Sequence, residues 1–306
     1  MPHGDLMKSD SDNRSMKTKS KTWRILNLGA GVQSTTVYLL AMDGEIPAID
    51  VAIFADTQEE PKAVYEHLKW LQSLGGPPIL VRSTGKLGND LARGIHSTGQ
   101  RFASIPAYTA PDHNSPRSAC SFGITRRQCT SEYKIKVVEN TIRRELFEVK
   151  FRGRVPKDVR AVQLFGISLD ERIRSMKIKK RFEDVYWSEP DFPLLEEGRR
   201  WRRDQCQQYL RDRVPHKVPR SACVFCPYHS DREWMDLKTN DPEGWARAVE
   251  VDNSLRVEGS VVNRSLNQKL YVHGQCIPLE MVKLEPDKKR QEGFFKFYCD
   301  EGMCGV

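Results

Sequence analysis

Hydrophobic positions follow two different periods along the first two thirds of the chain. Four short apolar runs, rich in β-branched residues and bounded by turn residues, predict buried strands: residues 23–28, 49–54, 79–81 and 161–168. Three segments between them carry apolar residues at helical spacing: 36–42, 62–74 and 131–147. Strands that alternate with helices predict an α/β domain with a parallel sheet covered by helices.

The remaining segments extend this picture toward the C-terminus. Residues 185–187 predict a fifth strand, and residues 84–125 are rich in Gly, Ser and Pro, which is typical of a long functional loop. After about residue 194 the pattern changes to short helices: 203–211, 231–239 and 242–256. We therefore expect a disordered tail (1–22), an α/β domain (23–195) and a helical, cysteine-containing portion (196–306).

Composition favours a globular protein with an anionic partner. The chain has 306 residues and a formal net charge of +8, which suits nucleotides or nucleic acid but is also common for an ordinary solvated surface. No apolar run approaches the roughly 20 residues that span a bilayer, and residues 1–22 lack the apolar core of a signal peptide. We expect a cytoplasmic protein with no membrane contact. In that compartment its eight cysteines are metal ligands, redox groups or core residues rather than disulfides.

The stretch NLGAGVQSTT, residues 27–36, carries the clearest chemical signal. It joins a predicted strand to a predicted helix, and backbone N–H groups at a helix N-terminus point toward negative charge. Gly29 and Gly31 permit positive φ and a close backbone approach, while Ser34, Thr35 and Thr36 offer hydroxyls to an oxyanion. The competing interpretation is an ordinary β–α turn that contains two glycines.

Polar clusters follow three of the predicted strands, at 29–35, 56–60 and 168–174. In open α/β sheets, ligands bind outside the carboxyl ends of the strands, where the strand order switches. We expect the three clusters to converge there.

The glycine turn resembles the pyrophosphate loop (S-G-G-x-D-S) of the ATP pyrophosphatase and PAPS reductase superfamily. Ala30 and Gly31 match the glycine pair, Gln33 takes the acidic position and Ser34 matches the serine. The turn lacks the Lys of a Walker A loop. Because Gln33 stands where the pattern has Asp, the turn lacks the carboxylate that a role such as holding a metal ion would need.

Four further segments are similar, in the same order, to the PAPS reductase-like branch of this superfamily. They are FADTQEEP, RRQCTSEYKIKVVE, GISLDERIR, and DFPLLEEGRRWRRDQC followed by SACVFCP. The chain thus resembles PAPS reductase-like proteins of the kind found near phage and mobile-element genes. The resemblance implies an adenine nucleotide alpha hydrolase fold of about five strands that binds ATP or an adenylyl sulfate (PAPS or APS), with Mg²⁺ as a further candidate.

On this alignment the nucleotide-binding residues come from the turn and from the strand ends that follow it. The expected set is Gly29, Ala30, Gly31, Gln33, Ser34, Thr35, Asp56, Thr57, Glu59, Arg127, Lys134, Arg172 and Arg174. The cations are needed because phosphate or sulfate transfer builds negative charge on departing oxygens. Asp56 and Glu59 are candidates for Mg²⁺ or a ribose hydroxyl, or alternatively for capping the helix that starts at Pro61.

The cysteines provide the second chemical signal. Cys223 and Cys226 form a C-x-x-C pair, a spacing at which two thiolates can bind one metal or cluster. The resemblance implies Cys129 as a third ligand of a [4Fe–4S] or Zn²⁺ centre. The fourth stays open, with Cys206 as the leading choice and the others in competition: Cys120, Cys299, Cys304 and His229. Helical spacing makes Cys206 a core candidate too, Cys276 is expected in the core, and Cys299 and Cys304 are candidate nucleophiles.

Three functions remain open from the sequence. The first is an enzyme that uses ATP or an adenylyl sulfate for sulfur transfer or adenylation, with a nucleic acid as acceptor or a sulfur-donor protein as partner. The second is a sulfonucleotide (PAPS or APS) reductase in which a tail thiolate attacks sulfur. The third is a regulatory or DNA-binding protein that keeps the fold and a structural zinc.

Overall fold

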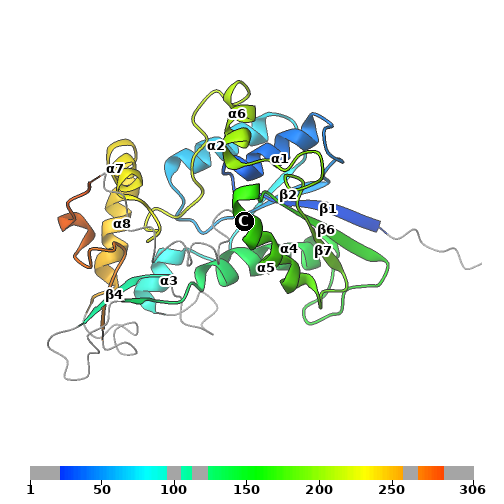
Figure 1. Ribbon diagram of the computed structural model, residues 1–306. Helices are drawn as coiled ribbons and strands as arrows, with labels where there is room; N and C mark the ends of the chain where they lie inside the picture. The colour runs from blue at the N-terminus through cyan, green and yellow to red at the C-terminus, as the bar shows by residue number, and fades with distance from the viewer. Residues whose placement is uncertain (1–20, 95–104, 112–122, 258–267, 286–306) are drawn as a thin grey trace, which may run out of the picture.

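A five-stranded parallel sheet organises the larger part of the molecule (Figure 1). The structure is a computed structural model, and it describes residues 21–94, 105–111, 123–257 and 268–285. The strand order is β3-β2-β1-β6-β7, with every neighbouring pair parallel. The strands are β1 (Lys21–Asn27), β2 (Val51–Ala55), β3 (Ile79–Arg82), β6 (Val159–Phe165) and β7 (Ser188–Asp191). The predicted α/β class is confirmed.

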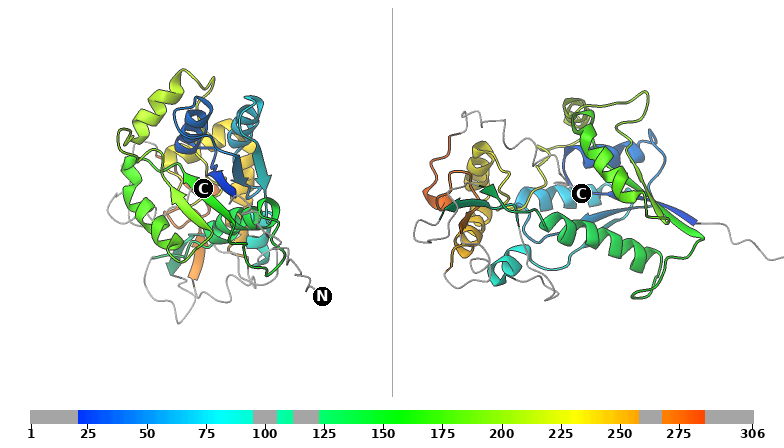
Figure 2. Two further views of the ribbon diagram at one scale, coloured as in Figure 1. Left: turned by 90° about the vertical axis from the view of Figure 1, so that its right-hand side faces the viewer. Right: turned by 60° about the horizontal axis from the view of Figure 1, so that its bottom comes forward.

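Both faces of this sheet are covered by helices, as Figure 2 shows. Successive strand residues point to opposite faces, so Ile25 packs in one core and Leu26 in the other. One face carries α1 (Val32–Met42), α2 (Lys62–Ser73) and α6 (Arg203–Arg211). The other carries α5 (Arg172–Phe182) and a continuous helix made of η1 (Thr130–Ile135), α4 (Lys136–Thr141) and η2 (Ile142–Leu146). This double cover explains why β2 is buried along its whole length.

A second, smaller body is built from segments far apart in the sequence. A three-stranded antiparallel sheet joins β5 (Gly123–Ile124), β4 (Tyr108–Pro111) and β8 (Gln268–Tyr271). It shares a core with α3 (Leu87–Arg93), α7 (Asp231–Asn240), α8 (Pro242–Ser254) and η4 (Leu279–Met281). These elements lie together on the left of Figure 1.

This second body corrects two expectations. The segment 84–125 contains α3, β4 and β5 in its described parts, so it is not only loop. The division at residue 195 also fails, because β8 pairs with β4 while α6 packs against α1 in the core of the large sheet. Strands as short as β4 and β5 need partners from elsewhere in the chain, and local sequence patterns do not reveal such partners.

Two strand boundaries differ from the sequence pattern. Strand β1 begins at Lys21, inside the predicted tail, and residues 1–20 lie outside the described residues. The fifth strand is the polar segment Ser188–Asp191, whereas Val185 and the two residues after it form a turn at the end of α5. The position of this edge strand is set by its pairing with β6 and not by the higher β-propensity of the residues before it. Among the described helices, none has the length and apolar character needed to cross a membrane.

Candidate nucleotide-binding site

The strand order places a ligand crevice beside β1. From β1 the chain builds outward to β2 and β3 on one side, and to β6 and β7 on the other. The turns after β1 and β6 therefore leave the sheet at the point where the strand order switches, which is where open α/β sheets bind ligands. The glycine turn follows β1, and η3 (Leu169–Glu171) with α5 follows β6.

The glycine turn is folded around the hydroxyl of Ser34. Its Oγ accepts hydrogen bonds from the backbone N–H groups of Gly29 and Gly31, at 3.2 and 3.3 Å. The residue with positive φ is Ala30, at 54°, and neither glycine has this conformation. The expectation that the glycines supply positive φ is therefore wrong. The two N–H groups nevertheless point at one oxygen, as donors in an oxyanion cradle must.

Gly166 allows the turn after β6 to approach the start of α1. A Cβ at this position would lie 2.6 Å from the backbone nitrogen of Ser34 and 2.7 Å from the carbonyl carbon of Gln33. Both neighbours are backbone atoms, so neither can move aside cheaply. The close approach of the two switch-point turns therefore depends on this glycine.

Gln33 links the turn to two neighbouring elements. Its amide nitrogen donates to Glu171 Oε2 at 3.1 Å, and its amide oxygen accepts from Arg203 Nη1 at 2.8 Å. Glu171 in turn accepts from Arg174 Nη1 at 3.1 Å, and Arg174 is almost fully buried. Arg172, by contrast, is exposed. A carboxylate thus lies next to Gln33, the position where the pyrophosphate loop has Asp, but Glu171 provides it rather than the turn.

Thr35 and Thr36 face the interior rather than the turn. The Thr35 hydroxyl lies 2.8 Å from His67 Nε2, and His67 Nδ1 lies 2.8 Å from His216 Nε2. The Thr36 hydroxyl donates to the carbonyl of Val32, one turn earlier. Burial and the neighbouring His216 lower the pKa of His67 to about 4, so this ring is neutral at physiological pH. Of the three hydroxyls predicted to meet an anion, only Ser34 lies at the turn.

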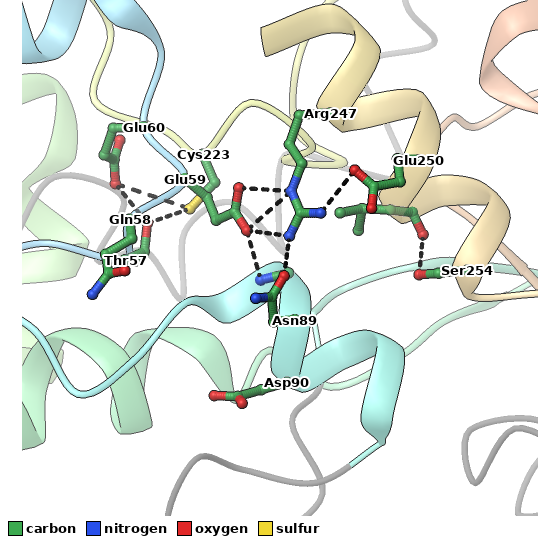
Figure 3. Close-up of polar contacts among 12 residues, drawn as sticks. Thr57, Gln58, Glu59, Glu60, Asn89, Asp90, Cys223, Arg247, Glu250 and Ser254 are labelled. Carbon is green, nitrogen blue, oxygen red and sulfur yellow. Dashed lines mark hydrogen bonds and ion pairs between the residues drawn. The ribbon is translucent and has the colours of Figure 1, made fainter. Parts of the chain in front are cut away.

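The carboxylates at the end of β2 are engaged by the protein itself. Asp56 Oδ1 accepts from the backbone N–H of Gln58 at 2.7 Å and from the hydroxyl of Tyr65 at 2.9 Å. Glu59 is buried and accepts three hydrogen bonds from Arg247 of α8, at 2.7, 3.1 and 3.3 Å (Figure 3). The Asp56 contacts fit a residue that orders the start of α2. Glu59 instead connects the large sheet to α8 of the smaller body.

Glu60 and Lys134 form a buried ion pair beside the cysteine segment. Lys134 Nζ lies 3.4 Å from Glu60 Oε1, and the Glu60 side chain is fully buried. Its other oxygen, Oε2, forms no hydrogen bond within the part of the chain that the structure describes. Thr57 bridges Glu60 Oε1 and Cys223 Sγ, at 3.3 and 3.1 Å (Figure 3). A lysine, a carboxylate and a thiol therefore meet at the carboxyl end of β2.

Three cysteines from two distant segments line one small cavity. Cys129, Cys223 and Cys226 share its wall with Arg127 and Lys134, and its volume is about 30 Å³. Burial raises the pKa of Cys223 and Glu60 raises it further, while Lys134 and the hydrogen bond with Thr57 act to lower it. Cys223 is therefore a neutral thiol unless a metal or a second cation stabilises the thiolate.

The cysteine segment also covers the glycine turn. A Cβ on Gly31 would lie 3.7 Å from the backbone nitrogen of Ser221 and 3.9 Å from the carbonyl oxygen of Pro219. Three residues later, the N–H of Val224 donates to the carbonyl of Glu59 at 2.7 Å. The segment 219–226 therefore spans from the turn after β1 to the turn after β2, which brings the two chemical signals of the sequence together.

The other predicted metal ligands lie elsewhere. Cys206 is fully buried in the core between α6 and α1, where burial raises its pKa to about 11. His229 contacts the carbonyl oxygen of Cys223 through Nε2 at 2.9 Å. Within the described ranges, no group of three or more His, Cys, Asp or Glu side chains is close enough to hold a metal ion. Cys120 and the two candidate nucleophiles, Cys299 and Cys304, lie outside the described residues.

Cys276 is also not in the core. It is half-buried, follows β8 in a turn and has a φ of 54°. The apolar residues before it suggested a strand that continues through the cysteine, but β8 ends at Tyr271.

A large open cleft adjoins the start of α1. Its volume is about 1070 Å³, and it lies between α2, α6, α7 and the segment 214–220. Val32 of α1 forms part of its wall, and charged side chains of both signs line it, among them Lys62, Arg203 and Glu233.

Several residues of the site escape sequence reasoning. Glu60 is adjacent to the predicted Glu59, but only the fold shows which of the two carboxylates faces Lys134. Glu171 lies in the segment GISLDERIR, and the resemblance of that segment to PAPS reductase-like proteins was the only signal that pointed to it. His67, His216 and Arg247 carry no sequence signal, because their contacts join elements that are distant in the chain.

The fold and this site define an α/β protein with a glycine turn at its switch point and a cysteine segment laid across that turn. No protein-family model matches the chain, and no curated protein has a matching sequence.

Proposed function

We propose that this chain is an adenine-nucleotide-binding enzyme of the PAPS reductase-like kind, which uses ATP or an adenylyl sulfate for sulfur transfer or adenylation. The supporting observation is the position of the segment 219–226 across the glycine turn and the end of β2. A phosphate or sulfate held at the turn would lie next to the cysteines and the Lys134–Glu60 pair. Nucleotide binding and thiol chemistry thereby share one crevice.

Each part of the crevice has a task in this proposal. The backbone N–H groups of Gly29 and Gly31 converge on the Ser34 hydroxyl, and in this proposal an anionic oxygen takes the place of that hydroxyl. Lys134 and Arg127, which line the cysteine cavity, stabilise negative charge on the departing group. Arg174, held by Glu171, which also accepts from Gln33, supplies a further cation near the turn.

Cys223 is the proposed sulfur-bearing or electron-carrying residue of the described cysteines. Its thiol lies 3.1 Å from Thr57 Oγ1 and next to Lys134, whose charge favours the thiolate against the effect of burial. A metal centre shared by Cys129, Cys223 and Cys226 stays an expectation from the resemblance. Their common cavity supports it. Among the described residues, however, these side chains are not close enough together to hold a metal ion, and the proposed reaction does not depend on such a centre.

The structural-zinc alternative is compatible with the C-x-x-C turn. Cys223 and Cys226 form a tight turn in which the N–H of Cys226 donates to the carbonyl of Cys223 at 2.9 Å. A C-x-x-C turn of this kind suits zinc as well as a cluster. In that case the protein would be a regulatory or DNA-binding member that keeps the fold.

Product analysis and metal analysis on anaerobically purified protein test the proposal. With ATP and Mg²⁺, we expect AMP and pyrophosphate rather than ADP and phosphate, because the resemblance is to enzymes that cleave between the α- and β-phosphates. Sulfite release from an adenylyl sulfate would instead identify a reductase. Stoichiometric zinc, no absorbance near 400 nm and no nucleotide turnover would reject the enzyme in favour of the structural-zinc protein.

A further inference from the structure

A basic turn with an exposed aromatic ring lies at the end of the sheet opposite to the crevice. It connects the helix that ends with η2 to β6, whose first residue pairs with the first residue of β1. The crevice lies at the carboxyl ends of these two strands, whereas this turn comes before β6. In Figure 1 the start of β1 points away from the smaller body. We call residues 150–154, KFRGR, the Phe151 turn.

Positive charge surrounds the Phe151 turn and is not balanced by carboxylates. The segment 148–157, EVKFRGRVPK, contains four basic residues and one acidic residue. Glu145 of the preceding η2 is already paired with Arg82, at 2.6 Å. The four basic side chains are exposed and form no ion pair with the described part of the chain: Lys150, Arg152, Arg154 and Lys157. A cluster of uncompensated cations is the electrostatic feature of surfaces that bind polyanions.

Phe151 lies among these cations with its ring open to solvent. It is 71% exposed, although the two valines on either side of the turn, Val149 and Val155, are buried. The guanidinium carbons of Arg144 and Arg152 lie 5.1 and 5.3 Å from the centre of the ring. An exposed aromatic ring among cations is the arrangement on which a single-stranded nucleic acid stacks a base while its phosphates meet the charges.

The backbone of the Phe151 turn is held in a strained conformation. The N–H of Gly153 donates to the carbonyl of Lys150 at 2.8 Å, and Arg143 Nη2 donates to the carbonyl of Gly153 at 2.9 Å. Glu148 and Arg152 have φ values of 54° and 61°, which cost free energy in residues other than glycine and persist where the surroundings fix them. A ring presented on such a fixed turn loses little conformational entropy when a partner binds.

We propose that the Phe151 turn binds a single-stranded nucleic acid, with one base stacked on Phe151 and the neighbouring phosphates bound by Lys150, Arg152 and Arg154. The planar guanidinium groups suit phosphate oxygens, which they can bind with two parallel hydrogen bonds. Binding of this kind tolerates any base sequence, because every base has a face that can stack. The proposal does not depend on the nucleotide site, which lies at the other end of the strands.

A membrane surface or a duplex suits the Phe151 turn less well. Within the segment 148–157, all of which the structure describes, Phe151 is the one large apolar side chain that is exposed. Attachment to a bilayer gains strength from the apolar area that it buries, and one ring provides little. In a duplex the bases stack on one another, so a protein ring reaches them only at the cost of unstacking a base step.

Nucleic-acid binding by matched variants tests the proposal. Phe151→Leu keeps an apolar side chain but removes the ring, and Lys150→Gln/Lys157→Gln removes two charges beside it. As the control, Lys69→Gln/Lys86→Gln removes two exposed charges from α2 and from the residue before α3. Fluorescence anisotropy without ATP, over a range of salt concentrations, measures affinity and salt slope. The probes are oligo(dT), oligo(U), an abasic deoxyribose-phosphate strand and a DNA duplex, all of one length.

We expect wild type to bind the single strands and Phe151→Leu to bind them about tenfold more weakly, with an unchanged salt slope. On the abasic strand Phe151→Leu should match wild type, because no base is there to stack. Lys150→Gln/Lys157→Gln should also bind about tenfold more weakly, and its slope of log K against log salt should fall by about 1.4, at roughly 0.7 per lost phosphate contact. The control should stay within about twofold of wild type. The tighter of oligo(dT) and oligo(U) identifies the polymer.

Wild-type affinity of Phe151→Leu for oligo(dT) and oligo(U) would overturn the proposal. Equal losses in the two lysine pairs would do the same, since binding would then follow net charge alone. So would tighter binding to the duplex than to either single strand, no binding to any strand, or binding only to vesicles that contain phosphatidylserine.

Two further measurements on Phe151→Leu separate this proposal from misfolding and from the nucleotide site. Because Phe151 is exposed, the melting temperature of the variant should match that of wild type. Calorimetry should show the same ATP affinity in both proteins. A wild type that binds oligo(dT) or oligo(U) but not ATP supports the Phe151 turn and rejects the nucleotide site.

Discussion

At the scale of single residues, the site depends on charges that the fold buries in pairs. Glu60 is fully buried and its partner Lys134 nearly so, at the carboxyl end of a strand that is itself buried. Two ions lose hydration there, and their mutual attraction with the bond from Thr57 offsets this cost. Such a pair is weak evidence for stability, but it places a cation and a carboxylate at fixed positions beside Cys223.

Breaking this pair should destabilise the protein more than removing both charges. We expect Lys134→Met to lower the free energy of unfolding by about 3–5 kcal/mol at neutral pH, because Glu60 stays buried without a counter-ion. The double variant Glu60→Gln/Lys134→Met should recover most of this loss. Urea denaturation measures both, and a double variant no more stable than the single one would show that the pair is not coupled as described.

The buried His67 should make stability depend on pH. In the unfolded chain His67 binds a proton below about pH 6.5, whereas in the fold its pKa is about 4. The unfolded state therefore binds more protons between these values, and stability falls as the pH decreases. We expect a loss of up to about 1.4 kcal/mol per pH unit from this residue between pH 6.5 and 4.

The difference between wild type and His67→Gln isolates this effect from other titrating groups. Urea unfolding at several pH values should give the variant a shallower decline over that interval. Parallel curves for the two proteins would contradict the low pKa of His67.

At the scale of elements, the crevice exists because two turns come unusually close. The turn after β6 meets the first residues of α1 at Gly166, where a side chain would collide with backbone. Sequence patterns predicted the strands and helices on either side of both turns. They did not predict this contact, because it depends on β1 and β6 being neighbours although more than a hundred residues separate them.

Alanine at the two glycines should therefore have unequal effects. At Gly166 the added methyl group overlaps the Ser34 and Gln33 backbone, and we expect a loss of about 1–3 kcal/mol with a distorted turn. At Gly31 the methyl group meets only ordinary contacts at 3.7 Å or more, so Gly31→Ala should be close to wild type in stability. Thermal unfolding compares the two, and equal melting temperatures would show that the turns are less tightly packed than described.

At the scale of the whole molecule, the sequence allowed the large sheet to be predicted but not the smaller body. The large sheet has long buried strands and amphipathic helices whose periodicity is visible locally. The smaller body depends on pairings such as β4 with β8, which connect segments about 160 residues apart. For the same reason, the meeting of Cys129 with Cys223 and Cys226 came only from the family resemblance, and the Glu59–Arg247 contact was missed.

Asp252 holds the smaller body together and offers a test of its unity. Its fully buried carboxylate accepts from the backbone N–H groups of Val272 and Leu279 and pairs with Arg256. Asp252→Ala leaves these donors unsatisfied, and we expect a loss of about 3–5 kcal/mol, against a smaller loss for Asp252→Asn, which keeps an acceptor. If both variants match wild type in urea, β8 is not anchored to α8 as described.

The central claim is that an adenine nucleotide binds at the glycine turn beneath the segment 219–226. Calorimetric titration of ATP with Mg²⁺ into wild type, Gly31→Leu and Glu60→Gln/Lys134→Met measures this most directly. A leucine at Gly31 must displace Ser221 and Pro219, and the double variant removes the cation without leaving a buried charge. We predict binding by wild type and a loss of about tenfold or more in both variants, with melting temperatures that show folded protein, because a charge-assisted contact contributes roughly 1.5–3 kcal/mol. Unchanged affinity in both folded variants would contradict the account.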